Sequence, residues 1–127
     1  MDLIQVMKAL SDETRMRILN LLKDNEMCVC EIETVLNISQ SNASRHLTKL
    51  TTAKILDYYK INKYVYYKID LDTIKAFPFI DEILRTQAIK LEQCKKDLQR
   101  LKKYKNSGLT CDDLKEGKAC HNIGECD

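Results

Sequence analysis

The spacing of apolar residues changes once along the chain, and this change constrains the fold more than any other feature. Up to residue 53 the apolar residues recur every three or four positions, which is typical of helices with one buried face. From Ile55 the pattern is strand-like, because 56–60 and 64–69 are rich in tyrosine and β-branched residues and flank a polar turn. The sequence therefore predicts a mainly α-helical domain with one small β-hairpin.

Four short helices are expected before the hairpin. Ser11 and Ser39 are suited to capping the second and the fourth helix, and Asn37 is suited to closing the third. The apolar positions that define the four buried faces are Leu3, Ile4, Met7 and Leu10; Ile18, Leu19, Leu21 and Leu22; Ile32, Val35 and Leu36; and Ala43, Leu47 and Leu50.

A single long helix is expected after the hairpin, from about Thr73 to Tyr104, with Asp70 and Asp72 as candidate caps. A heptad seam of more than three repeats is typical of helices that pair, so this helix is expected to bind a second copy of itself. The two rows of the seam are Phe77, Leu84, Leu91 and Leu98, and Ile80, Gln87, Cys94 and Leu101.

The length and the glycine content exclude several classes of protein. The 127 residues suffice for one domain, which we place at 1–105, followed by a mobile, cysteine-containing tail at 106–127. All three glycines lie after residue 105, so the domain has no glycine-rich loop for a nucleotide phosphate, and Rossmann or P-loop enzymes are excluded. No signal peptide and no membrane-spanning apolar run is present, which predicts a cytoplasmic protein without a membrane partner.

Two short helices followed by a basic hairpin form the pattern of a winged helix-turn-helix. Residues 45–68 contain six basic side chains and one acidic one, a local charge of +5, which is the surface that double-stranded DNA requires. The alternative is that the charge run is merely a solvated face. The net charge of +2 divides into +5 for residues 1–105 and −3 for residues 106–127.

A helical turn of about 100° per residue separates the polar face of the fourth helix from its apolar face. Arg45 is the side chain best suited to bidentate guanine recognition, and His46 lies at the flank of the polar face. The tip of the hairpin is expected to contact phosphate or the minor groove, whereas its tyrosines are expected to pack within the wing. The predicted DNA-contacting residues are Gln40, Ser41, Asn42, Ser44, Arg45, His46, Thr48, Lys49, Lys60, Asn62 and Lys63.

Cys28 and Cys30 lie at the start of the third helix, next to the DNA-reading helix. A cytosolic chain keeps its thiols reduced, so the cysteines are interpreted as ligands or sensors rather than as disulfides. Within a helix, side chains two residues apart point about 200° apart, so joint chelation requires a non-helical first turn. Soft thiolates select soft ions, and the pair supplies two of three sulfurs for trivalent arsenic or antimony, or two of four ligands for zinc. The alternative is that both are small, partly buried hydrophobes.

The motifs in this order resemble the ArsR/SmtB family of metalloregulatory repressors over about residues 3–104. The matching stretches are the run from Leu10 to Leu19, the Cys28–Glu31 box, Ser39–Ser41 with Ser44–Leu47, and the wing strand Tyr64–Tyr67. The resemblance implies a homodimer, joined through its first and last helices, that represses an arsenic-resistance operon. It further implies that the dimer leaves a palindromic operator when arsenite or antimonite binds the cysteines.

One position departs from the arsenite-sensing pattern, in which the box extends to a third cysteine. Glu33 stands there and is a poor ligand for a soft ion, so a third sulfur has to come from Cys94, from Cys111, Cys120 or Cys126 in the tail, or from a small thiol. A monomethylated arsenical would need only two sulfurs. The zinc-sensing branch places histidine ligands on the last helix, and no histidine occurs between Thr73 and Tyr104, so that zinc site is missing.

The other cysteines have competing interpretations. Cys94 is on the heptad seam, where we favour a small buried hydrophobe at the dimer interface. The tail offers three sulfurs and His121, enough for one tetrahedral zinc, but their spacing matches no known zinc finger and a zinc site is not favoured. The alternatives for the tail are thiols without a role, a second inducer site, and capture and transfer of the ion.

Two further functions stay open beside the arsenic-responsive repressor. Adjacent thiols beside a basic surface also suit a redox- or persulfide-sensing repressor of the same fold. A small thiol enzyme or a metallochaperone belongs to a different class. We do not expect an enzyme. The two histidines, His46 and His121, lie in the predicted DNA-reading helix and in the tail, and no anion-binding loop precedes Cys28.

Overall fold

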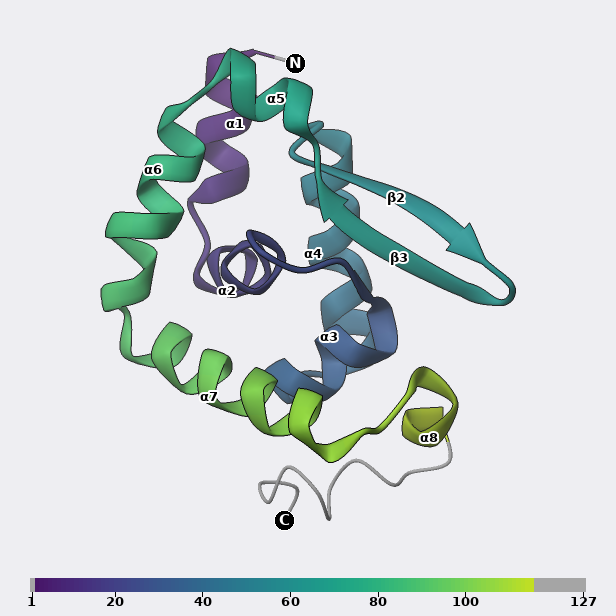
Figure 1. The fold of residues 1–127 in the computed structure, drawn as a ribbon. Coiled ribbons are helices and arrows are strands. Elements are labelled where there is room, and N and C mark those ends of the chain that lie inside the picture. The colour runs from purple at the N-terminus through teal and green to yellow at the C-terminus, as the bar shows by residue number, and fades with distance from the viewer. Residues whose placement is uncertain (1, 116–127) are drawn as a thin grey trace.

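The computed structural model describes residues 2–115, which fold into a body of helices with a small sheet that projects from one side (Figure 1). In chain order the elements are α1 (Leu3–Leu10), α2 (Glu13–Leu22), β1 (Met27–Cys28), α3 (Val29–Leu36), α4 (Gln40–Thr52), β2 (Leu56–Ile61), β3 (Tyr64–Ile69), α5 (Leu71–Ala76), α6 (Phe79–Thr86), the 3-10 turn η1 (Ala88–Lys90), α7 (Glu92–Ser107) and α8 (Cys111–Lys115). None of these helices is long and apolar enough to cross a membrane.

Helices α2, α3 and α4 confirm the predicted pattern of apolar residues, but the predicted buried face of α1 is wrong, because Leu3, Ile4 and Met7 are exposed in the single chain. The predicted buried faces of α2, α3 and α4 lie in one hydrophobic core with Val6 and Leu10 of α1. Ser39 caps α4 by accepting a hydrogen bond from the backbone N–H of Asn42. The predicted cap of α2 is wrong, because Asp12 accepts from the N–H of Arg15 while Ser11 ends α1.

Helices α3 and α4 form the helix-turn-helix, joined by only three residues. Asn37 ends α3 in the left-handed conformation, with a φ of 56°, and its N–H is bonded to carbonyl groups of the last turn. Asparagine tolerates this backbone region better than most side chains, which is why the chain can turn sharply there. Helix α4 begins directly after this turn. Its apolar residues Leu47 and Leu50 lie in the core, and most of its polar residues stay at the surface.

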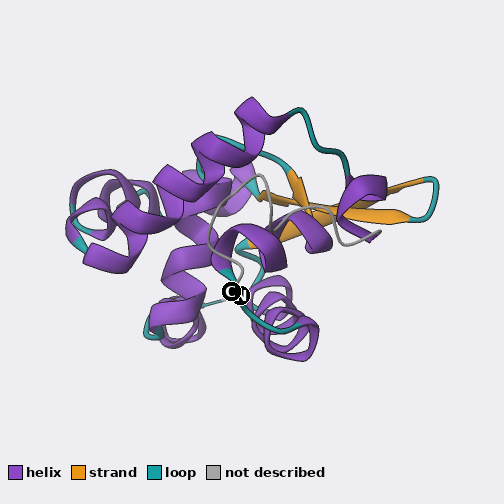
Figure 2. Cartoon of the chain, turned by 90° about the horizontal axis from the view of Figure 1, so that it is seen from below, coloured by secondary structure: helices purple, strands orange, loops and turns teal. Residues whose placement is uncertain are grey.

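The predicted hairpin is confirmed, and a short strand extends it. Strands β2 and β3 pair in antiparallel register from Leu56 opposite Ile69 to Ile61 opposite Tyr64. Strand β1 lies on the other side of β3, with Cys28 opposite Tyr66, so the strand order is β1-β3-β2. Figure 2 shows this hairpin extending to one side of the helices as a wing. The cysteine box is thereby joined directly to the wing.

The single long helix predicted after the hairpin is wrong. Three helices and a 3-10 turn replace it, with breaks at Phe77–Pro78 and at Leu91. Pro78 disfavours a helical conformation in the residue before it, and Phe77 accordingly has a φ of −131° and a ψ of 73°. The heptad residues Ile80, Leu84 and Leu101 lie in the core of the chain itself, so they do not form an outward-facing seam.

Helix α7 packs against α2 and α3. Arg17 of α2 forms a bidentate ion pair with the fully buried Asp97 of α7, at 2.8 and 2.9 Å. Arg100 of α7 donates to the carbonyl oxygens of Thr34 and Val35 in α3. These contacts fix α7 across the end of α3.

The boundary predicted between residues 105 and 106 does not coincide with an end of the folded structure. Helix α7 continues to Ser107, Gly108 turns the chain with a φ of 74°, and α8 packs against α3. Leu109 and Leu114 are partly buried against the main core. The predicted tail residues after 115, including Cys120, His121 and Cys126, lie outside the described residues.

Candidate metal centre and nucleic-acid interface

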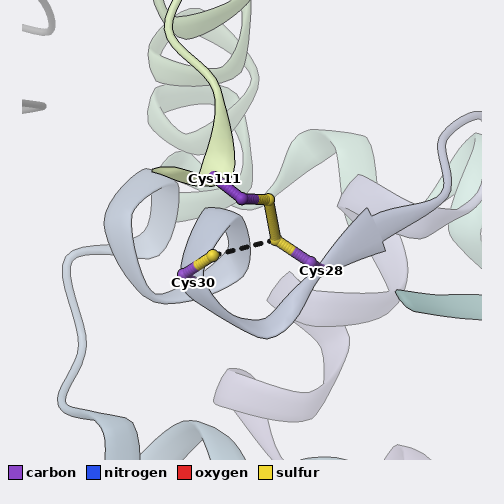
Figure 3. Close-up of side chains that lie close together, drawn as sticks. All are labelled: Cys28, Cys30 and Cys111. Carbon is purple, nitrogen blue, oxygen red and sulfur yellow. Dashed lines mark hydrogen bonds between the residues drawn. A yellow bond between two sulfur atoms is a disulfide. The ribbon is translucent and has the colours of Figure 1, made fainter. Parts of the chain in front are cut away.

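Cys28 and Cys30 meet because only one of them is helical. Cys28 precedes the first turn of α3 with an extended backbone, a φ of −80° and a ψ of 163°, whereas Cys30 is the second residue of the helix. The conformation required for joint chelation is therefore present, and the two Sγ atoms lie 2.9 Å apart (Figure 3). A binding site built on this pair needs no unwinding of α3.

Cys111 brings a third sulfur to the pair. Its side chain points from α8 toward the start of α3, and the structure joins it to Cys28 in a disulfide across 83 residues of sequence (Figure 3). The sulfurs of Cys28, Cys30 and Cys111 all lie within 4.8 Å of one another. The sequence left four candidates for the third sulfur, and the structure brings Cys111 to the pair.

The surroundings of the three sulfurs suit a soft ion once the disulfide is reduced. Two sulfurs bound to one ion at about 2.3 Å in a tetrahedral arrangement lie roughly 3.8 Å apart, so Cys28 and Cys30, with sulfurs 2.9 Å apart, have to separate slightly to hold an ion. The Cα atoms of Cys28 and Cys111 are 7.5 Å apart, beyond the usual span of a disulfide of about 4.4–6.8 Å. Cys28 and Cys111 are buried and Cys30 is half-buried, so the site is shielded from most water.

Glu31 and Tyr104 hold the cysteine box in its conformation. One carboxylate oxygen of Glu31 accepts the backbone N–H of Cys28 at 3.0 Å, and the other accepts the hydroxyl of Tyr104 at 2.5 Å. Burial and the bond to Glu31 raise the pKa of Tyr104, which keeps its hydroxyl protonated as a donor. This role was not predicted from the sequence, although a glutamate three residues after a helix cap is a recognisable capping pattern.

Cys94 lies apart from the three-sulfur cluster. It is fully buried in α7 beside Arg17 and Asp97, and burial, aided by the nearby Asp97 carboxylate, raises the pKa of its thiol. A protonated thiol is a poor ligand, because the thiolate is the form that binds metals. The structure thus agrees with a small buried hydrophobe, but the surroundings are the core of one chain instead of the predicted interface.

The outer face of α4 carries most of the predicted DNA contacts. Arg45 donates to the side chain of Asn42 at 2.8 Å, which orients its guanidinium across the surface. Asn42 is half-buried, and the exposed residues of this face are Gln40, Ser41, Ser44, Arg45, Thr48 and Lys49.

His46 does not belong to this outer face. Its side chain is 7% exposed, and its Nδ1 accepts a hydrogen bond from Arg15 at 3.1 Å. Arg15 also donates to the carbonyl oxygens of Lys8 and Ala9, so the cluster ties α1 to α4. Burial lowers the pKa of His46, which favours the neutral ring. We therefore assign His46 to packing and leave it out of the DNA-contacting set.

The wing presents its predicted tip residues to solvent. Lys60, Asn62 and Lys63 are exposed, and Asn62 takes the left-handed conformation that reverses the chain. The tyrosines form cross-strand pairs, with Tyr59 stacked on Tyr66 at 5.6 Å and Tyr58 beside Tyr67 at 5.9 Å. These rings stiffen the hairpin, as expected for packing within the wing.

Comparisons with known proteins agree with this architecture. Residues 12–58 match the model of the family described as bacterial regulatory protein, arsR family. The arsenical resistance operon repressor of Escherichia coli K12 is 37% identical over 99 residues, which cover 76% of this chain and 85% of that protein. The cadmium resistance transcriptional regulatory protein CadC homolog of Staphylococcus aureus is 41% identical over 76 residues, which are 59% of this chain and 63% of that protein.

A solved structure extends the likeness to three dimensions. Reduced HlyU from Vibrio cholerae superposes with a TM-score of 0.59 at 32% identity, covering 66% of this chain and 86% of HlyU. The helix-turn-helix, the wing and the sequence relatives lead to the same conclusion: the chain belongs to the ArsR family of bacterial regulatory proteins.

Proposed function

We propose that the chain is a DNA-binding transcriptional repressor of an arsenic-resistance operon, and that trivalent arsenic or antimony releases it from a palindromic operator. The observation that carries this proposal is the cluster of Cys28, Cys30 and Cys111. Three soft donors in a shielded site suit a three-coordinate soft ion, whereas structural zinc almost always takes four ligands. An operator-binding regulator works in the bacterial cytoplasm, where thiols stay reduced.

A homodimer is part of the proposal, and α1 supports it. Leu3, Ile4 and Met7 are 50%, 60% and 48% exposed in the single chain, on a helix whose other face is buried. An apolar face of this kind marks a protein contact. A second copy would cover it and present two copies of α4 to the two halves of a palindrome.

The test is operator binding followed by fluorescence anisotropy while arsenite, antimonite, zinc and cadmium are added in turn. We expect arsenite and antimonite to release the reduced wild-type protein. Cys28→Ser should bind the operator with unchanged affinity and no longer respond, while Cys94→Ser, the matched control, should respond normally. Normal release of the Cys28→Ser variant would contradict the proposal.

The DNA-reading assignment has its own test in two exposed basic residues. Arg45→Ala should cost about 1–3 kcal/mol on the cognate operator and less on random DNA, because it removes a base contact. Lys63→Ala should weaken both about equally, since a phosphate contact carries no sequence information. A sequence-selective loss for Lys63→Ala would contradict its assignment to phosphate.

A second candidate function is thiol-oxidation sensing, favoured by the disulfide between Cys28 and Cys111. The two thiols would give two electrons and two protons to hydrogen peroxide, forming the disulfide and two water molecules. Peroxide would then release the operator, and a dithiol reductant would restore binding. Mass spectrometry of the peroxide-treated protein, compared with the arsenite titration, separates the two functions.

A further inference from the structure

The acidic side chain of α8 lies against the tip of the DNA-binding wing. Asp112 accepts a hydrogen bond from the hydroxyl of Tyr64, and its carboxylate lies 3.8 Å from the Nζ of Lys63. Lys63 is the wing residue predicted to contact phosphate. A carboxylate at this place occupies the lysine and repels a DNA phosphate that approaches the same ammonium group.

The position of α8 depends on its cysteine. Helix α8 has only five residues, and isolated helices of that length are unstable in water. Leu109 and Leu114 contribute partial burial, and Thr110 and Asp113 cap each other. The bond from Cys111 to Cys28 is the one covalent anchor of α8 to the body of the protein among the described residues.

The anchor and the wing are parts of one rigid sheet. Cys28 is paired with Tyr66 across β1 and β3, and the hydroxyl of Tyr66 lies 3.8 Å from the Sγ of Cys111. Tyr64, the partner of Asp112, is two residues away on the same face of β3. Fixing Cys111 at the sulfur cluster therefore places Asp112 at the wing tip.

We propose that α8 is a strap whose capture by the sulfur cluster masks the wing. When Cys111 joins Cys28 and Cys30 around the soft ion, Asp112 pairs with Lys63 and Tyr64, and the wing loses its hold on phosphate. In the structure the disulfide to Cys28 holds Cys111 in this place. In the reduced protein without the ion neither bond holds Cys111, so α8 leaves the wing and Lys63 is free to bind DNA. The strap gives the inducer a route to the DNA-binding surface within one chain.

Arsenite binding and operator binding are linked through the strap, so each must weaken the other. Since DNA and the docked α8 compete for the same lysine, operator DNA must weaken arsenite binding by the same factor by which arsenite weakens operator binding.

The proposal rests on the arsenite response proposed above, and Asp112→Asn tests it separately. This variant keeps the size of the side chain and all three cysteines, so arsenite should still bind, as followed by ultraviolet absorbance. Asp57→Asn is the matched control, because it removes one acid from the same wing, away from the contact with α8.

Two operator affinities are then measured for each protein, one with and one without saturating arsenite. Loss of the Asp112 charge should raise the affinity of the arsenite-loaded protein about fivefold per wing, as expected for one exposed ion pair and a charge-assisted hydrogen bond. The arsenite-free affinity should stay close to that of the wild type. Asp57→Asn should shift both states equally, and Asp112→Glu should restore release.

Hydrogen exchange supplies a readout that needs no DNA. Arsenite should slow amide exchange in the wing peptide that contains Lys63 and Tyr64 in the wild type, but not in Asp112→Asn. The strap is overturned if Asp112→Asn binds arsenite and still shows wild-type release and protection. If the wild type itself is not released by arsenite, or if Cys28→Ser is, the proposed function fails instead.

Discussion

The two ends of α3 are held in different ways. Arginines of the packed body hold the end next to α4, whereas the start of α3 is held by side chains that a ligand can rearrange. At the end of α3 next to α4, Arg100 and Arg17 donate to the carbonyl oxygens of Thr34, Val35 and Leu36. Both arginines come from the packed body of the protein. The end that leads into α4 is therefore fixed by hydrogen bonds from arginines of the packed body.

The start of α3 is held by groups that a ligand can rearrange. Cys28 caps the helix, Cys30 lies in its first turn, and Cys111 reaches them from a short helix near the end of the described chain. Thiols exchange protons, soft ions and disulfide partners under cellular conditions. In the proposed repressor, an ion at this end would change what is docked on the wing while the helix-turn-helix keeps its geometry.

The largest expected effect comes from breaking the fixed end. Asp97→Ala should lower the free energy of unfolding by about 3 kcal/mol, because it leaves the guanidinium of Arg17 without its buried partner. Urea unfolding of the arsenite-free protein measures it. The control is Asp81→Ala, which removes an exposed partner of Arg85 and should cost under about 1 kcal/mol. Equal losses for the two variants would mean that the buried pair does not stabilise this end.

Arsenite binding at the start of α3 should depend on Cys111 and should not depend on Cys94. Cys111→Ser should weaken arsenite binding by more than the roughly 10- to 100-fold that loss of an outer contact costs, because it removes one of the three ligands of the proposed site. In reducing buffer, where the bond between Cys111 and Cys28 is absent, unfolding in urea should change little. Cys94→Ser should leave arsenite affinity unchanged, since that thiol is outside the cluster. Calorimetric titration of both variants checks this, and a loss confined to Cys94→Ser would reverse the assignment.

Local patterns in the sequence predicted the helix-turn-helix and the wing, but they did not predict which cysteine joins Cys28 and Cys30. The faces of α2–α4, the hairpin and the cap at Ser39 all depend on neighbouring residues, and all were predicted. His46 lies at the border between two faces of α4, where helical geometry alone does not decide between packing and exposure.

The missed features depend on contacts that are distant in sequence. Strand β1 has only two residues and exists because it pairs with β3. The heptad pattern after Thr73 predicted one helix, but the same apolar residues are buried by a chain that bends at Pro78 and folds back on α2. The choice of Cys111 over Cys94 rests on a contact across 83 residues, which spacing cannot reveal.

A smaller effect is expected from the residues that orient the start of α3. Glu31→Gln should weaken arsenite binding about tenfold, because an outer contact fixes the conformation of Cys28 without touching the ion. Tyr104→Phe should have a similar but weaker effect, since it removes only the hydroxyl bonded to Glu31. Both variants should reach one arsenite per chain at saturation. A lower stoichiometry would make Glu31 a ligand instead of a positioning residue.

The smallest effect is the pH dependence of the contact between α8 and the wing. The hydrogen bond to Asp112 raises the pKa of Tyr64 from 10.0 to about 12, with smaller contributions from slight burial and from Asp112, Cys30 and Tyr66, while Lys63 also faces the carboxylate. A raised pKa means that the docked state favours the protonated hydroxyl. The contact therefore stabilises the docked strap fully below pH 10, and this contribution is lost as the pH rises through about 12.

Carbon-13 NMR of labelled tyrosine should show Tyr64 titrating near 12 in the strapped protein and closer to 10 in Asp112→Asn, with Tyr58 as the internal control. Titration of Tyr64 at the same pH in both proteins would show that its hydroxyl does not donate to Asp112 in solution. Any effect of an ion at the start of α3 on the wing would then have to pass through β1 alone.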